Sequence, residues 1–300
     1  MRKLPYQLTD KLFVLGQDLF LTYLVLGNPC TLLDLGVSAS VPLIEEQLRE
    51  LGVKNEDIGH LVVLHAHWDH VCGLPYMKHI FPNATVWGSA KAQEVLNKSR
   101  IVDSFRRNDE KYCTRLKELG EFKELVPFLD YNTMTVERII EDEETVIMGG
   151  IEIKFLATPG HSPCTLSAFI PSEQATIISD AIGCYDPIID EYLALFFQGV
   201  QKTLDSLERL KELDAKIVAY CHDTEMIFLG QDEIDNSYKR IKEELIRIRK
   251  EIQEMEAAGA SEQDLLDKVF QASYKGLLTR MYPPEYIKAV APLLLKAINK

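Results

Sequence analysis

The chain has 300 residues, of which 46% are hydrophobic, and this length and composition suit a folded protein with a substantial core. Its formal net charge of −13 argues against a nucleic-acid partner, because that binding relies on clustered lysine and arginine side chains. No stretch approaches the roughly 18 consecutive apolar residues of a membrane span, and no signal-peptide pattern follows the first residues. We therefore expect a soluble, cytoplasmic protein that binds neither nucleic acid nor membranes.

The first 35 residues alternate short β-rich runs with turn signals. Runs at 11–15, 19–26 and 31–35 predict an antiparallel meander. Pro42 just after Ser40 predicts the start of a helix, and Gly52 predicts its end. The wholly apolar run at 61–64 predicts a short strand that is buried on both faces.

The middle of the chain combines helical and strand patterns. Residues 75–99 predict a helix, a strand at 84–87 and a second helix, and residues 100–128 are charged and helical in pattern, which indicates a helical insertion at about 99–130. Strands are expected at 144–148, 151–157, 165–170 and 176–179, with Gly149 and Gly150 forming a hairpin turn. The alternation of strand groups and helices predicts a layered α/β body.

From residue 201 the pattern is mostly helical, interrupted by an apolar strand at 217–220. In a helix predicted at 232–255, apolar residues recur at intervals of four and three and form one narrow stripe. This stripe can form a homodimer, pack on the C-terminal helices over a cleft, or belong to the core, and intramolecular packing is the usual outcome. Ser261 with Asp264 predicts a capping box for the next helix, and Pro283-Pro284 precedes the last one.

The segment LVVLHAHWDH places four side chains of metal-ligand type in six positions, directly after the apolar strand at 61–64. Residues two apart in an extended segment point to the same side, so His65 and His67 can hold one ion. Asp69 and His70 follow after the chain turns and can address a second ion. The spacing of these residues therefore predicts a metal site with two neighbouring ions.

Three further residues of ligand type follow β-like runs later in the chain: His161 in TPGHS, Asp180 in IISD and His222 in AYCHD. Each stands near the end of a predicted strand, so all three can converge on one rim of the sheets. Five of the seven histidines lie in these motifs, which chance packing does not explain. His60 and His79 are isolated and are interpreted as surface or half-buried residues.

The ordered set HAHWDH, TPGHS, SDA and a histidine after a strand resembles the metallo-β-lactamase superfamily over roughly residues 10 to 225. The resemblance implies a four-layer αββα sandwich of the α/β class, with a helical insertion and extra C-terminal helices. It assigns three ligands to the first metal, three to the second and one that bridges both: His65, His67 and His161; Asp69, His70 and His222; and Asp180. In one departure, Cys221 and Asp223 flank the last histidine, where glycines commonly stand in the superfamily.

Within that superfamily the chain is similar to the bacterial quinolone-signal response thioesterases, of the 2-aminobenzoylacetyl-CoA thioesterase type. The similarity lies in the length, a helical insertion before the third histidine motif, extra C-terminal helices, and the runs HVCGLPYM and LDSLERLKEL. It implies a catalytic domain at 1–230, with the insertion at about 99–130, and a helical extension at 231–300 that packs on that domain.

Two divalent ions lower the pKa of a bound water to roughly 7 and polarise the bond under attack, so the ligands specify hydrolysis by a metal-bridging hydroxide. Asp69 is expected to be catalytic, because it can coordinate a metal and also orient the nucleophilic water. Zinc is the default metal of the superfamily, and iron or manganese suit the same ligands. No dedicated acid for an amide leaving group is evident, which favours a thioester or an ester of a small acyl or aromatic acid.

Two other functions remain open: a phosphodiesterase of the same fold, and a regulatory or binding protein whose hydrolytic site is incidental. The segment YDPIIDEYLALFF at 185–197 is apolar and aromatic just past Asp180, so it can form the wall of a pocket for a small-molecule substrate or simply belong to the core. The candidate substrate-binding residues are Cys184, Tyr185, Tyr192 and Phe196.

Overall fold

The computed structural model describes residues 2–118 and 130–298. Contacts within the chain divide it into two compact units. Unit 1 consists of Met1–Leu156 with Ala168–Glu173, and unit 2 consists of Ala157–Ser167 with Gln174–Lys300. This division does not address the expected catalytic domain at 1–230 and helical extension at 231–300, which stay a prediction.

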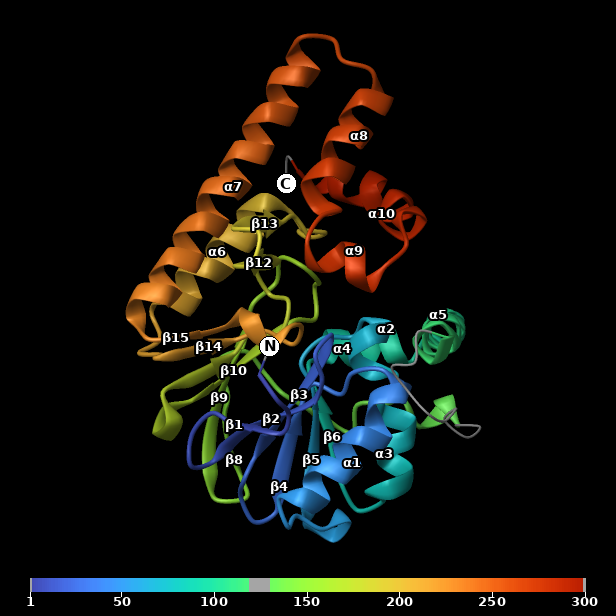
Figure 1. The fold of residues 1–300 in the computed structure, drawn as a ribbon, viewed down its shortest axis with the longest axis vertical. Coiled ribbons are helices and arrows are strands. Elements are labelled where there is room, and N and C mark those ends of the chain that lie inside the picture. The colour runs from blue at the N-terminus through green and yellow to red at the C-terminus, as the bar shows by residue number, and fades with distance from the viewer. Residues whose placement is uncertain (1, 119–129, 299–300) are drawn as a thin grey trace. The chain divides into compact units, whose positions relative to one another are not determined.

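Unit 1 contains a seven-stranded sheet in the order β1-β2-β3-β4-β5-β6-β7 (Figure 1). The first four strands pair antiparallel, which confirms the predicted meander, and β4 to β7 pair in parallel. The strands are β1 (Tyr6–Gln7), β2 (Leu12–Gln17), β3 (Phe20–Val25), β4 (Cys30–Leu33), β5 (Ile58–Val63), β6 (Thr85–Gly88) and β7 (Arg138–Ile139).

Apolar side chains on both faces of the central strands hold this sheet in the core. Leu32 on β4 and Val62 on β5 are completely buried, as the unbroken apolar runs predict for strands covered on both sides. Helices α1 (Val41–Glu50) and α3 (Leu74–Ile80) lie on one face of the sheet (Figure 1). Helix α1 carries a proline in its first turn and is followed by Gly52 at a φ of 74°, a conformation that favours glycine, so both predicted boundary signals are confirmed.

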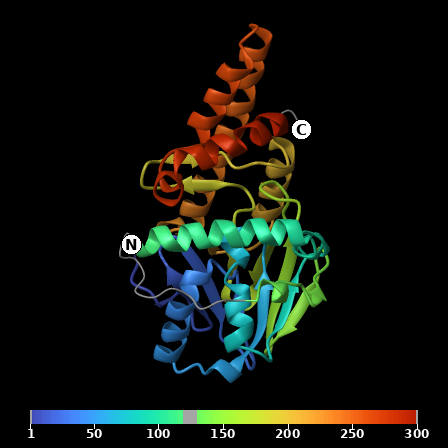
Figure 2. The same cartoon turned by 90° about the vertical axis from the view of Figure 1, so that its right-hand side faces the viewer.

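The charged segment that predicts a helical insertion forms α5 (Ser99–Glu118). Figure 2 shows this long helix crossing unit 1, and it contacts α2 (Trp68–Val71) and α4 (Ala90–Leu96). The ring of Tyr112 on α5 packs edge-on against Phe20, with ring centroids 5.3 Å apart. Residues 119–129, which belong to the same prediction, lie outside the described residues.

A six-stranded sheet has the order β15-β14-β11-β10-β9-β8. Strands β8 and β9 form the predicted hairpin through Gly149 and Gly150, both at positive φ. Strands β11 and β14 are parallel, and β15 returns antiparallel to β14. The strands are β8 (Thr145–Met148), β9 (Ile151–Ala157), β10 (Leu166–Ile170), β11 (Ala175–Ile177), β14 (Ile217–Ala219) and β15 (Ile227–Leu229).

Unit 2 also holds most of the helical part of the chain and a two-stranded sheet that the sequence patterns do not predict. In Figure 1, α7 and α8 run side by side as an antiparallel pair. The elements are β12 (Cys184–Asp186), β13 (Glu191–Leu193), α6 (Val200–Lys211), α7 (Gln231–Ala257), α8 (Glu262–Ser273), α9 (Leu277–Met281) and α10 (Pro284–Ala297).

The apolar stripe of α7 packs inside unit 2, where the helix contacts α6, α8 and β12 to β13. Its members, all buried except the half-buried last one, are Ile234, Tyr238, Ile241, Leu245, Ile248, Ile252 and Met255. Intramolecular packing therefore accounts for the regular spacing. Both hydrogen bonds of the predicted capping box between Ser261 and Asp264 are present at the start of α8.

The chain has a mixed α/β fold with two main sheets, flanking helices and additional C-terminal helices, as the sequence predicts. Within the described ranges, no helix combines the length and the apolar character that crossing a bilayer requires.

Candidate metal centre

The parallel pairing of β4 and β5 places two polar segments at one edge of the sheet of unit 1. Leu33 pairs with Val62, so Asp34 and His65 both lie just past the paired ends of their strands. Ligand atoms of Asp34, His65 and His70 lie within 4.8 Å of one another, and all three residues are buried. Three buried groups of metal-ligand type thus meet where the sheet ends.

Asp34 fixes the orientation of the His70 ring. Both carboxylate oxygens of Asp34 lie 2.9 Å from Nδ1 of His70. Since a carboxylate only accepts hydrogen bonds, Nδ1 donates, and the lone pair of His70 is on Nε2. That Nε2 lies 3.5 Å from Oδ2 of Asp69. A carboxylate behind a histidine in this way sets its tautomer and strengthens it as a ligand.

The sequence patterns did not single out Asp34, because its partner lies 36 residues further along the chain. The available signal was its place directly after an apolar strand, the same place that draws attention to Asp180. Asp34 also has a positive φ of 59°, a conformation that aspartate adopts more readily than most residues other than glycine.

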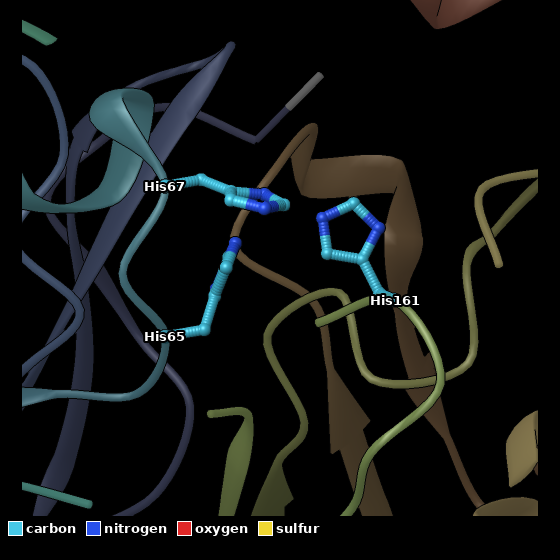
Figure 3. A group of neighbouring side chains, drawn as sticks. All are labelled: His65, His67 and His161. Carbon is cyan, nitrogen blue, oxygen red and sulfur yellow. The ribbon is translucent and has the colours of Figure 1, made fainter. Parts of the chain in front are cut away.

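His65 and His67 lie on the loop between β5 and α2. Figure 3 shows that both rings extend from the same side of this loop, as predicted for residues two apart in an extended segment. Their ring centroids are 4.8 Å apart and their planes meet at 78°. His65 is completely buried, whereas His67 is half-buried. Figure 3 also draws His161, which follows β9 and belongs to unit 2.

In unit 2, the parallel strands β11 and β14 bring Asp180 and His222 together. Ile177 pairs with Ala219, and each ligand-type residue stands three positions beyond its member of this pair. Oδ2 of Asp180 lies 3.5 Å from Nε2 of His222 and 3.6 Å from Nε2 of His161. One carboxylate oxygen is therefore shared between two imidazole nitrogens, and all three residues are buried.

The backbone of unit 2 fixes the ring of His161. Its Nδ1 donates to the carbonyl oxygen of Leu195 at 3.0 Å, which leaves the lone pair on Nε2, the nitrogen nearer Asp180. Gly160 allows the loop to come this close, because a Cβ at that position would lie 2.8 Å from the carbonyl oxygen of Ala181. Such a contact is too short for any other residue.

The spacings between these nitrogen and oxygen atoms fit shared metal ions. At 3.5–3.6 Å they are longer than a normal N–H···O hydrogen bond. Two ligands that each lie about 2.1 Å from one tetrahedral ion are about 3.4 Å apart, close to the observed values. Histidine and carboxylate groups are also the donors that zinc, iron and manganese take. The residues present therefore fit divalent metal ions, and the assignment of seven ligands to two ions stays a prediction.

The predicted substrate contacts lie in unit 2, on or near the β12–β13 hairpin, and none exposes more than 5% of its surface. The hydroxyl of Tyr185 donates to Asp190 at 2.5 Å, and its ring stacks on Phe228. Burial and this hydrogen bond raise the pKa of Tyr185. The hydroxyl of Tyr192 donates to the carbonyl oxygen of Ile182. Cys184 and Phe196 are buried, and a role of these four side chains toward substrate stays a prediction.

Comparison with curated proteins finds relatives that match more than half of the chain. The chain is 26% identical to the hydroxyacylglutathione hydrolase of Prochlorococcus marinus, covering 70% of each protein. It is 28% identical to the N-acyl homoserine lactonase of Bacillus thuringiensis and 22% identical to glyoxylase B2 of Dictyostelium discoideum. These two matches cover 59% and 62% of the chain, and the chain spans 61% of the length of each relative.

Solved structures share the fold at lower sequence identity. A metallo-β-lactamase family protein of Thermus thermophilus matches with a TM-score of 0.64 and 17% identity, covering 96% of this chain and 93% of that one. A superfamily protein of Sulfolobus tokodaii matches with a TM-score of 0.55 and 19% identity, covering 80% and 86%. The family model described as the metallo-beta-lactamase superfamily matches residues 21–222, well over half of the chain. The chain belongs to the metallo-β-lactamase superfamily.

Proposed function

We propose that this protein is a binuclear metal-dependent hydrolase that cleaves a thioester or an ester of a small acyl or aromatic acid. The observation that carries the proposal is the presence of two clusters of ligand-type residues, one in each unit, which we call half-sites. In each half-site a histidine nitrogen lies 3.5–3.6 Å from a carboxylate oxygen. The half-site of unit 1 contributes His65, His67, Asp69 and His70, and that of unit 2 contributes His161, Asp180 and His222. Membership of the superfamily supports a metal-dependent hydrolase.

The ions would supply an activated water and polarise the bond under attack. The side chains of this protein have three distinct tasks in that reaction. The histidines hold the ions through nitrogens whose tautomers are fixed by Asp34 and by the Leu195 carbonyl. Asp180 has one oxygen between two imidazoles and is suited to bridge the ions. Asp69 is suited to accept a hydrogen bond from the attacking water and to aim it at the acyl carbon.

The names of two relatives favour acyl substrates, because hydroxyacylglutathione carries an acyl group on sulfur and a homoserine lactone is a cyclic ester. A thiolate leaves without much protonation, because the pKa of its thiol is near 8.5. The acidic chain agrees with a small-molecule substrate and with the absence of a nucleic-acid partner. We further propose zinc as the metal, with iron or manganese as substitutes, and a cytoplasmic location. A homodimer through the C-terminal helices remains a proposal.

Metal analysis coupled to a substrate screen tests this function. The purified protein should carry two divalent ions per chain and hydrolyse at least one class among acyl-CoA thioesters, aryl esters and lactones. Treatment with a chelator should abolish the activity, and adding back zinc, iron or manganese should restore it and identify the metal. Protein that carries two ions yet cleaves only bis-p-nitrophenyl phosphate would replace the proposal with a phosphodiesterase. Protein that is inert toward the whole panel would refute hydrolysis.

A further inference from the structure

The loop after β14 has an unfavourable backbone conformation next to a proposed ligand. Asp223 directly follows His222 and has φ 51° and ψ 122°, a region in which side-chain-bearing residues are strained. The residue is almost completely buried, with 1% of its surface exposed. A conformation of this kind persists only when surrounding contacts hold it.

Three contacts hold Asp223. Its Oδ1 accepts a hydrogen bond from the backbone nitrogen of Glu225 at 3.0 Å, at the start of the short 3-10 helix Thr224–Met226. Its carbonyl oxygen accepts from the backbone nitrogen of Met226 at 2.9 Å. Its Oδ2 forms a close ion pair with the guanidinium of Arg280, which lies 57 residues further along the chain on α9. Arg280 thus places a positive charge beside a carboxylate that is almost completely buried.

Helix α9 is itself fixed to the segment that follows Asp180. The backbone nitrogen of Leu277 donates to Oδ2 of Asp186, on β12, at 3.0 Å. Gly276 has a φ of 48°, and a Cβ there would lie 2.4 Å from the same carboxylate oxygen, so only glycine permits this approach. Helix α9 is therefore bound, within unit 2, to the segment that follows Asp180. From this helix, Arg280 contacts the residue next to His222.

We propose that Arg280 is a positioning residue for the proposed metal site. It neutralises and orients Asp223, and Asp223 in turn fixes the backbone of His222 and the direction of its Nε2. The inference rests on the proposed function, because it concerns a ligand of that site. The C-terminal helices then contribute to metal binding through one ion pair, although they contain none of the seven predicted ligands.

Zinc titrations of the full-length protein in competition with a chromogenic chelator test this role. The variants are Arg280→Ala, Arg280→Lys and, as a matched control, Lys275→Ala, which breaks the ion pair of Lys275 with Glu191 just before α9. Wild type should bind two ions. Arg280→Ala should retain one tight ion and bind the other about 10- to 100-fold more weakly, the range seen when a residue supporting a ligand is lost. Arg280→Lys should recover part of that affinity, and Lys275→Ala should match wild type.

A double-mutant cycle with Asp223→Gly separates positioning from general loss of structure. Glycine adopts the positive φ without strain and leaves no buried carboxylate, so Arg280→Ala should have little further effect in that background. The visible spectrum of the cobalt-substituted protein should change in Arg280→Ala and not in Lys275→Ala. Circular dichroism checks that each variant is folded.

The outcomes distinguish this inference from the proposed function. If wild type binds two ions and Arg280→Ala binds both with unchanged affinity, Arg280 has no positioning role and the proposed function stands. If Lys275→Ala weakens the second ion as much as Arg280→Ala does, docking of α9 rather than the Arg280 charge is responsible, and the inference is overturned. If wild type binds no ion tightly, the proposed function itself is wrong.

Discussion

Asp34 holds His70 with both of its carboxylate oxygens, each 2.9 Å from Nδ1 of the ring. Asp34 directly follows β4, His70 lies on α2, and each exposes 1% of its surface. The carboxylate binds the ring at Nδ1 and leaves Nε2 with the lone pair, so it can support a metal ligand without belonging to the proposed ligand set. This relationship leads to the first prediction.

We expect Asp34→Asn to weaken metal binding about 10- to 100-fold, because the neutral amide no longer polarises the His70 ring. Asparagine tolerates the positive φ of this position, so the substitution tests the charge rather than the backbone. Zinc affinity measured against a competing chelator checks the effect, and Asp10→Asn at an exposed site of the same unit is the control. Equal affinities in the two variants would show that Asp34 does not support a ligand.

Asp69→Asn should lower kcat by about 10²- to 10⁴-fold on whichever substrate the screen identifies, because the amide lacks the negative charge and one of the two acceptor oxygens of the carboxylate. The thermal unfolding midpoint should change little, since asparagine has the same size. Steady-state kinetics and thermal melts measure both quantities, with the exposed Asp57→Asn as the matched control. A variant with wild-type kcat would remove Asp69 from the catalytic role.

Burial raises the pKa of Asp109 to about 6 from an ordinary value of 3.8, although hydrogen bonds from Ser38 and Tyr131 oppose the rise. A raised pKa in the folded state means that the protonated form stabilises the fold at low pH and that this contribution is lost as pH rises through about 6. From pH 4 to pH 7, the free energy of unfolding of wild type should therefore fall by about 2 to 3 kcal/mol relative to Asp109→Asn.

Urea unfolding of metal-free protein measures this difference, so that metal binding does not contribute to the pH dependence. Asp103→Asn, at an exposed position on the same helix α5, should behave like wild type at every pH. If the free energies of unfolding of wild type and Asp109→Asn differ by the same amount at pH 4 and at pH 7, the Asp109 carboxyl does not titrate in that range.

The stripe of α7 predicts opposite results for two isoleucines on the same helix. Ile241 is completely buried, so Ile241→Ala should reduce the free energy of unfolding by about 2 to 5 kcal/mol. Ile246 is 42% exposed, so Ile246→Ala should change it by about 0.5 kcal/mol or less. The stripe packs within unit 2, so a dimer that uses only the exposed side of α7 would leave the effect of Ile241→Ala unchanged and would make the melting temperature depend on protein concentration. If the melting temperature of wild type rises with protein concentration and that of Ile246→Ala does not, the protein forms a dimer through this helix.

Local patterns in the sequence were sufficient for much of the fold. Alternation and turn residues predict β2 to β4 and the β8–β9 hairpin, and the recurring apolar residues predict α7, because each of these signals lies within one element. The strands β12, β13 and β15 have three residues each and carry no such period, so they are not predictable in this way. The half-site of unit 1 was also visible, since four of its residues fall within six positions.

What the sequence by itself determined is the identity of the ligand-type residues and the family they imply. Only the tertiary structure decided which residues support them: Asp34 behind His70, and Arg280 beside the residue that follows His222. These pairs are 36 and 57 residues apart, and their meeting depends on the register of parallel strands and on the docking of a late helix. Spacing along the chain predicts neither the strand register nor the docking of the helix. Both are set by packing between distant segments, which leaves no local period in the sequence.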